Sequence, residues 1–244
     1  MTQIPTSAPP DRLERILENG VLRVGTTMDT PVFSMRNASG GLEGFDMDAL
    51  ATLADALGVR IDYVKMTFGT MLPDLLADKF DIAMSGMGRT LDRARVATFS
   101  KPYMQYGKLM MIRSADEDRF KTLADLDRPG LKIAFNKGGL NDSFANTEFK
   151  QAERIGYPDN VRATADLLAG KVDAQVQDST AAIYRARINP QVTAMSPEKV
   201  FNPVYVAALL RREDQTLLNY INLWIDQIQM DGTLVKIRTK WLGG

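Results

Sequence analysis

One eight-residue pattern that occurs twice constrains the fold of this chain more than any other feature. Residues 74–81 (DLLADKFD) recur as residues 166–173 (DLLAGKVD). In both copies a helical pattern ends, the chain turns through one residue and a lysine, and an apolar strand begins. Such residues suit many helix-to-strand turns, so the recurrence has a local explanation. The alternative explanation is two lobes of similar topology, one built around each copy.

The rest of the sequence alternates between strand and helix patterns. Alternation of this kind is typical of α/β folds with mostly parallel strands. If the chain forms two lobes, it crosses between them near residues 108–112 and 202–207, and helices at 214–230 and 232–241 return to the first lobe. Strands are predicted at residues 21–25, 59–63, 81–85, 131–135 and 172–177, helices at 11–18, 47–57, 70–77, 141–151 and 164–169, and a hairpin turn at 39–41.

The composition excludes several classes of function. The sequence contains neither cysteine nor histidine. Cysteine and histidine nucleophiles, Cys/His zinc sites and Ser-His-Asp triads are therefore excluded, and neither a metal nor a cofactor is predicted. Lys+Arg and Asp+Glu are equal at 30 each. Because nucleic-acid binding normally needs a basic face, no nucleic-acid partner is predicted.

The first ten residues are polar and rich in proline. They have no apolar core of the kind that a signal peptide needs. We therefore expect residues 1–10 to be a disordered leader, and no signal peptide is predicted within the sequence as given. Apolar runs elsewhere stay below the roughly 20 residues of a transmembrane helix.

Short motifs in a fixed order resemble the periplasmic amino-acid-binding proteins of ABC importers, which form solute-binding protein family 3. The resemblance extends from about residue 13 to residue 244. It is carried by residues 20–25 (GVLRVG), 42–48 (LEGFDMD), 80–87 (FDIAMSGM), 90–93 (TLDR) and 99–103 (FSKPY).

This resemblance implies an α/β, two-lobed periplasmic-binding-protein-like (type II) fold, in which each lobe is a mostly parallel sheet flanked by helices and the ligand cleft lies between the lobes. Residues 11–108 with 205–244 would form the first lobe, and residues 109–204 the second. It also implies a periplasmic monomer that binds a small amino acid or carboxylate and delivers it to a membrane ABC permease. A sensor lobe that presents its ligand to a membrane partner is the alternative, because the same fold serves receptors.

Within this family the chain resembles the cyclohexadienyl dehydratases, which make phenylpyruvate or phenylalanine from prephenate or arogenate. The shared pieces include residues 80–86, 107–108, 136–139 and 170–171. Those enzymes carry a glutamate general acid three residues after the acid that corresponds to Asp178, and this chain has Ala181 there. Losing a general acid typically costs about 10²–10⁴-fold in rate. Binding without catalysis is therefore the expected function, with weak or lost dehydratase activity as the alternative.

Two charged residues are the principal candidates for ligand binding. Arg93 corresponds to the family arginine that holds the ligand carboxylate, and a guanidinium forms two parallel hydrogen bonds with a carboxylate. The alternative is a surface arginine that pairs with Asp92 or Asp46. Asp178 corresponds to the family acid that accepts the ligand ammonium. The alternative is an ordinary helix N-cap, and both roles are compatible.

The other candidates in the first lobe lie at predicted strand ends. Phe68 corresponds to the aromatic residue that stacks on the ligand in relatives, with a core phenylalanine as the alternative. Thr30 stands where relatives often have a second aromatic residue. Ser85, Gly86 and Gly88 offer backbone groups at close approach, and many relatives have Ser or Thr in place of Gly88. The neighbouring arginine at position 89 either enters the cleft or is solvated.

The second lobe contributes a strand-to-helix loop and one lysine. Asn136, Gly139 and Leu140 belong to this loop, whose free amides at the following helix would favour a carboxylate. Many binding proteins have Thr in this loop, and the dehydratases have Thr in place of Leu140. Lys108 is placed on a strand that crosses between the lobes. Its side chain either enters the cleft and contacts the ligand, or it points away from the cleft.

Overall fold

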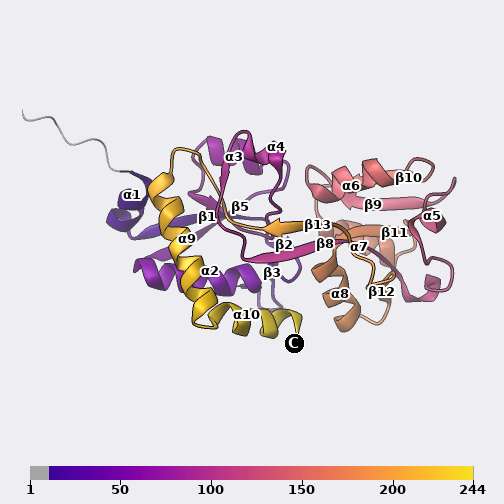
Figure 1. The fold of residues 1–244 in the computed structure, drawn as a ribbon. Coiled ribbons are helices and arrows are strands. Elements are labelled where there is room, and N and C mark those ends of the chain that lie inside the picture. The colour runs from indigo at the N-terminus through magenta and orange to yellow at the C-terminus, as the bar shows by residue number, and fades with distance from the viewer. Residues whose placement is uncertain (1–10, 244) are drawn as a thin grey trace, which may run out of the picture.

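The structure is a computed structural model that describes residues 11–243, and these fold into two α/β lobes (Figure 1). A β-sheet flanked by helices forms the centre of each lobe. The predicted two-lobed α/β fold is therefore confirmed. The predicted leader, residues 1–10, lies outside the described residues. Within the described range, every helix is too short or too polar to cross a membrane.

The first lobe contains a five-stranded sheet in the order β5–β1–β6–β14–β7. β1 pairs in parallel with β5 and β6, and β14 pairs antiparallel with β6 and β7. The strands are β1 (Val21–Thr26), β5 (Arg60–Lys65), β6 (Ile82–Ala83), β7 (Thr98–Phe99) and β14 (Leu209–Leu210). The helices are α1 (Arg12–Asn19), α2 (Phe45–Leu57), α3 (Met71–Leu76), α4 (Leu91–Ala94), α9 (Gln215–Met230) and α10 (Thr233–Leu242).

A small antiparallel sheet projects from the first lobe. It consists of β2 (Asp29–Thr30), β3 (Ser34–Arg36) and β4 (Leu42–Glu43). The register pairs Arg36 with Leu42, so the predicted hairpin turn at residues 39–41 lies between β3 and β4. Its strand β2 contacts the second lobe, because the Asp29 carboxylate accepts a hydrogen bond from the Asn160 backbone amide.

The second lobe contains a sheet in the order β10–β9–β11–β8–β12, and β13 also pairs with β8. The strands are β8 (Met104–Arg113), β9 (Lys132–Asn136), β10 (Glu153–Tyr157), β11 (Ala174–Asp178), β12 (Val192–Ala194) and β13 (Phe201–Val206). The helices are α5 (Leu123–Leu126), α6 (Leu140–Glu148), α7 (Asn160–Leu168) and α8 (Ser179–Ile188), with a 3-10 helix η1 (Ser114–Asp116).

Two long strands connect the lobes. β8 leaves the first lobe and β13 returns to it, and the two run side by side (Figure 1). Because one strand leaves and the other returns, they pair antiparallel. β8 is also antiparallel to β11 and β12, so the sheets are mixed, with more antiparallel pairing than the sequence predicted. The predicted crossings at residues 108–112 and 202–207 overlap β8 and β13, and the predicted lobe boundaries at 108/109 and 204/205 stay predictions.

The two copies of the repeated sequence form the same structure, one in each lobe. In the first, the Lys79 amide donates to the Asp74 carbonyl, and the Asp81 amide donates to the neighbouring strand β1 at the Arg23 carbonyl. In the second, the amides of Lys171 and Asp173 make the equivalent bonds, to the carbonyl of Asp166 and to that of Lys132 on the neighbouring strand β9. Even the left-handed turn residue is shared, with φ 59° at Asp78 and 70° at Gly170. The recurrence therefore reflects two lobes of similar topology.

Each lobe has its own buried apolar clusters. In the second lobe, successive residues of β8 point to opposite faces of the sheet, as strand geometry requires. Met110 and Ile112 enter one buried cluster, and Leu109 and Met111 enter another. The first lobe has its own clusters around β1, α2 and α9. Two separately packed units joined by two strands are the usual construction of a hinge protein.

Candidate functional site

Six of the predicted site residues line one small cavity between the lobes. The cavity has a volume of about 10 Å³, which is roughly the space of one water molecule. Both lobes and the connecting strand β8 contribute to its walls. The predicted residues that line it are Phe68, Arg93, Lys108, Asn136, Leu140 and Asp178.

Arg93 is a buried cation with unused hydrogen-bonding capacity. It lies in α4, whose first turn is capped by Thr90 through a bond from the Arg93 amide (3.2 Å). The side chain is 8% exposed and its Nη1 donates to the Gly88 carbonyl at 2.8 Å. Among residues 11–243, no carboxylate lies within ion-pair distance of it, so the predicted alternative of a pair with Asp92 or Asp46 is not observed. Burial lowers the pKa of Arg93. Four guanidinium N–H groups remain for an anion.

Lys108 and Asp178 form a buried ion pair in the same cavity. They are direct neighbours across β8 and β11, and Lys108 Nζ donates to the Asp178 carboxylate. Lys108 is only 3% exposed, and its Nζ lies 5.0 Å from the centre of the Tyr106 ring. Burial lowers the pKa of Lys108, and the charge of Asp178 opposes this effect. Asp178 is the N-cap residue of α8, but its side chain makes no capping bond to the described amides because it is directed to Lys108.

Three further residues of this cavity were not singled out from the sequence: Tyr106, Asn141 and Asn160. Tyr106 donates to the Gly86 carbonyl (3.1 Å), and Asn141 Nδ2 donates to Asn136 Oδ1 (2.7 Å). The Oδ1 atoms of Asn141 and Asn160 are buried without a partner among the described residues. Asn160 was missed because the strand before it, β10, has no apolar alternation. The alternation of β8 places Tyr106 on the same face as Lys108, and this signal was available.

Ser85 and Thr30 do not line the small cavity and belong to a buried hydroxyl network in the first lobe. Ser85 Oγ lies 2.8 Å from Thr27 Oγ1 and 2.7 Å from Ser34 Oγ. Thr30 Oγ1 lies 2.7 Å from Thr27 Oγ1. Through Thr27, this network reaches a second and larger cavity. Ser85 and Thr30 therefore support the ends of β1 and β2.

Gly88, Leu140 and Gly139 are positions of close packing between the lobes. A Cβ atom on Gly88 would lie 2.5 Å from Leu140 Cδ1. Gly88 and Leu140 are thus in contact, and the Leu140 methyl group fills the space that a side chain at position 88 would take. A Cβ atom on Gly139 would lie 3.1 Å from Phe68 Cβ. Arg89 is exposed, in agreement with the solvated alternative.

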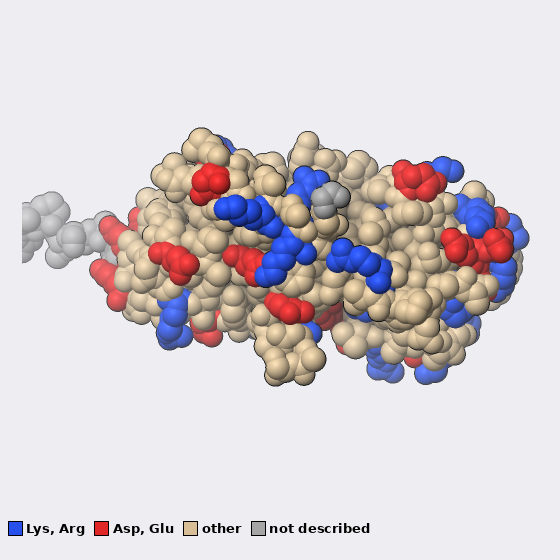
Figure 2. Space-filling model, turned by 90° about the horizontal axis from the view of Figure 1, so that it is seen from below, with Lys and Arg blue, Asp and Glu red and all other residues tan. Residues whose placement is uncertain are grey.

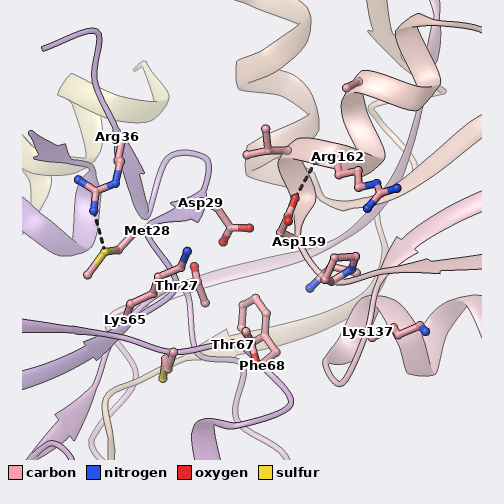
Figure 3. Close-up of a pocket in the computed structure, with 15 residues that line it drawn as sticks. Thr27, Met28, Asp29, Arg36, Lys65, Thr67, Phe68, Lys137, Asp159 and Arg162 are labelled. Carbon is pink, nitrogen blue, oxygen red and sulfur yellow. Dashed lines mark hydrogen bonds between the residues drawn. The ribbon is translucent and has the colours of Figure 1, made fainter. Parts of the chain in front are cut away.

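The larger cavity adjoins the small one and has a volume of about 560 Å³. Phe68 and Asn136 line both cavities. Figure 3 shows Asp29, Lys65 and Phe68 extending toward the larger cavity from the first lobe. The Asp29 carboxylate accepts a hydrogen bond from the backbone amide of Asn160, the first residue of α7, at 3.1 Å. This bond joins the two lobes. This cavity is large enough for a ligand side chain.

Gly86 is held in place by a buried carboxylate. Asp46 Oδ2 accepts from the Gly86 amide (2.7 Å), and Asp46 Oδ1 accepts from the Tyr103 hydroxyl (2.8 Å). Gly86 has a positive φ of 66°, and a Cβ atom there would lie 2.6 Å from the Phe33 ring. Burial raises the pKa of Asp46 to about 7, while the two hydrogen bonds oppose the rise.

We expect Asp46→Asn to remove a pH dependence of stability. The folded-state pKa of about 7 exceeds the ordinary value of 3.8. Asp46 therefore contributes stability that is complete below pH 3.8 and is lost as the pH rises through 7. Asparagine can accept from the Gly86 amide and donate to Tyr103, so the fold should persist. Urea unfolding from about pH 5 to 8 should show a smaller decline in the free energy of unfolding for Asp46→Asn than for wild type.

The matched control is Asp55→Asn, an exposed aspartate on the same helix, α2. This variant should follow the wild-type pH profile. Parallel profiles for wild type and Asp46→Asn would show that Asp46 does not titrate in this range.

Comparison with known proteins agrees with this geometry. Residues 22–244 match the family model of bacterial extracellular solute-binding proteins, family 3. A cyclohexadienyl dehydratase of Pseudomonas aeruginosa is 38% identical over 96% of this chain and 87% of its own length. The ABC transporter arginine-binding protein 1 of Escherichia coli is 26% identical, with 90% of each chain covered.

Solved structures resemble the whole chain. An ancestral amino acid-binding protein, described as a precursor of cyclohexadienyl dehydratase, has a TM-score of 0.89 and 34% identity, and covers 94% of this chain and 99% of its own. A mutant of an arginine-binding protein from T. maritima has a TM-score of 0.88 and 30% identity, and covers 95% and 99%. The relatives thus include amino-acid-binding proteins and an enzyme on one fold.

Proposed function

This chain belongs to family 3 of the bacterial extracellular solute-binding proteins, and from that premise we propose that it captures a small amino-acid-like or carboxylate ligand in the cleft between its lobes. The observation that carries the proposal is the buried Arg93 guanidinium, which faces the interlobe cavity without a carboxylate partner among the described residues. A buried cation without a partner is costly, and a ligand carboxylate would offset that cost.

Binding proceeds by closure of the two lobes in this proposal. Because the cavity beside Arg93 has a volume of only about 10 Å³, an acid reaches the guanidinium only after the lobes move apart. β8 and β13 are the two strands that can bend as a hinge. A ligand that contacts both lobes stabilises the closed form, since the open form offers it only one set of contacts.

We propose a transport role outside the cytoplasm for this chain, as a periplasmic monomer that presents its closed shape to a membrane ABC permease. The family description as extracellular and the name of the arginine-binding relative support this role. Basic and acidic side chains are interspersed over both lobes on the face drawn in Figure 2. Their mixture agrees with the formal net charge of zero.

A dehydratase-like enzyme is the second candidate, favoured by the 38% identity to cyclohexadienyl dehydratase. The residue at the position of the catalytic glutamate argues against it. Ala181 is buried in α8 and is not among the residues that line the small cavity. Its methyl group cannot transfer a proton to a leaving hydroxyl. We therefore propose binding without turnover.

A thermal-shift screen tests the proposed function. The panel contains the twenty amino acids, common organic acids, prephenate and arogenate. A ligand at 100 times its Kd should stabilise the chain by about 2.7 kcal/mol, which at about 2–4 °C per kcal/mol raises the Tm by about 5–11 °C. We expect at least one acid to do so, and we expect no phenylpyruvate from prephenate. If no compound of the panel raises the Tm, the binding proposal is contradicted. Steady formation of phenylpyruvate from prephenate would show that the chain is an enzyme.

A further inference from the structure

We infer that the preferred ligand is a carboxylic acid without an α-ammonium group, such as a 2-hydroxy or 2-oxo acid, because Lys108 already neutralises Asp178. This inference deepens the proposed function and rests on it. Asp178 was predicted to accept the ligand ammonium. The structure instead places the Lys108 ammonium on that carboxylate, inside the same cavity.

The first argument for this inference is the net charge of the side chains that line the small cavity. Arg93 and Lys108 are cations and Asp178 is an anion, so the cavity has one excess positive charge. All three side chains are buried. An acid with a single carboxylate brings one negative charge and balances the site. A zwitterionic amino acid brings no net charge and leaves one cation uncompensated in a poorly solvated space, which is costly.

The second argument is competition for Asp178. Lys108 is fixed by its strand, since β8 and β11 place it directly opposite Asp178. Its ammonium also lies against the Tyr106 ring. A ligand ammonium on the same carboxylate would stand close to this cation, and like charges repel strongly where water is scarce. Lys108 thus occupies the place that an amino-acid ligand would need.

The third argument is that two asparagine side chains in the cavity have no hydrogen-bond partner for their oxygen atoms among the described residues. The Oδ1 atoms of Asn141 and Asn160 are buried without a partner among the described residues, and both side chains line the cavity. A buried polar atom of this kind normally has a hydrogen-bond partner. A ligand hydroxyl can donate to either oxygen. Asn141 is fixed by its bond to Asn136, whereas the Asn160 side-chain amide can turn over and donate to a 2-oxo group. Both side chains are neutral, so they suit a hydroxyl or oxo group and offer an ammonium no opposite charge.

The test compares acids that share one carbon skeleton. Isothermal titration calorimetry is run with two sets in which the amino acid is a neutral zwitterion and the hydroxy and oxo acids carry one carboxylate: phenylalanine, phenyllactate and phenylpyruvate, and leucine, 2-hydroxy-4-methylpentanoate and 4-methyl-2-oxopentanoate. In at least one set, the wild type should bind the hydroxy or oxo acid at least about tenfold more tightly than the amino acid, the effect expected of one lost charge–charge contact. Whichever of the hydroxy acid and the oxo acid binds more tightly identifies the ligand class.

The variant Lys108→Met keeps the apolar stem and removes the charge. It frees Asp178 for an ammonium, so the preference should shift by at least about tenfold toward the amino acid. Lys236→Met, at an exposed lysine on α10, is the matched control and should keep the wild-type preference. If Lys108→Met does not fold, the wild-type preference alone decides.

The outcomes separate this inference from the proposed function. Wild-type binding that favours the amino acid, or a preference for the hydroxy or oxo acid below about tenfold in both sets, overturns the inference and leaves the proposed function standing. A folded Lys108→Met with an unchanged preference also overturns it. If no amino, hydroxy or oxo acid binds at all, the proposed function fails and the inference fails with it.

Discussion

Replacing Arg93 with alanine is expected to abolish ligand binding while the chain stays folded. The guanidinium offers several free N–H groups in a buried cavity, where a bond to a carboxylate is strong. Removing one partner of such a pair costs about 2–5 kcal/mol or more of binding free energy, which weakens the Kd at least about 30-fold. Among the hydrogen bonds of the described residues, the variant loses the one from the Arg93 side chain to the Gly88 carbonyl. Calorimetric titration with the acid that shifts the melting temperature most measures the loss.

The matched control is Arg95→Ala. Arg95 is exposed at the end of the same helix, α4. The Arg95→Ala variant should bind the acid with the wild-type Kd. This result would show that the loss in Arg93→Ala comes from the ligand contact and not from removing positive charge from this helix. Wild-type affinity in a folded Arg93→Ala would remove Arg93 from the binding site.

Alanine at Gly138 is expected to prevent closure, and ligand affinity should fall at least about tenfold. Gly138 of the second lobe lies against Gly69 of the first, and a Cβ atom there would lie 2.5 Å from Gly69 Cα. Backbone on both sides leaves no flexible side chain to give way. The lobes would have to stay further apart, so the ligand would lose contacts with one of them. The measurement is the Kd of the same acid.

Gly130→Ala separates closure from backbone strain. Both glycines have positive φ, 80° at Gly138 and 87° at Gly130, so alanine at either should cost about 1–2 kcal/mol of stability. A Cβ atom on Gly130 has nothing within 4 Å. Gly130→Ala should therefore keep the wild-type Kd. Equal Kd values for the two variants would contradict closure at this contact.

Local sequence patterns predicted the fold well because they specify local structure. The repeated eight-residue sequence forms the same turn in each lobe, closed by a bond from its lysine amide. The helix predicted at residues 47–57 ends where expected, because Gly58 directly after it is a left-handed C-cap with φ 68°. β10 was missed because Glu153–Tyr157 mixes charged and apolar residues without alternation. The antiparallel pairing of β8 was missed because strand direction depends on contacts distant in sequence.

The candidate site was predicted in part for a similar reason. Ligands bind outside the carboxyl ends of the strands in α/β folds, and a cleft between two lobes brings those ends together. Arg93, Asp178 and Asn136 were therefore expected near one another, and they line one cavity. The pairing of Asp178 with Lys108 depends on the register of β8 against β11, which the sequence does not display. Asn160 stayed unnoticed because the strand that positions it was not predicted. Ser85 and Thr30 were expected at the ligand, yet their hydroxyl groups bond within the first lobe.

Small-angle X-ray scattering of the wild-type chain, with and without a saturating acid, tests most directly whether two lobes close around a ligand. The ligand-free chain should have the larger radius of gyration, since an acid can reach Arg93 only when the lobes stand apart. Saturation should bring the radius down to that of the closed structure. An acid that binds with full occupancy and leaves the radius of gyration unchanged would contradict closure.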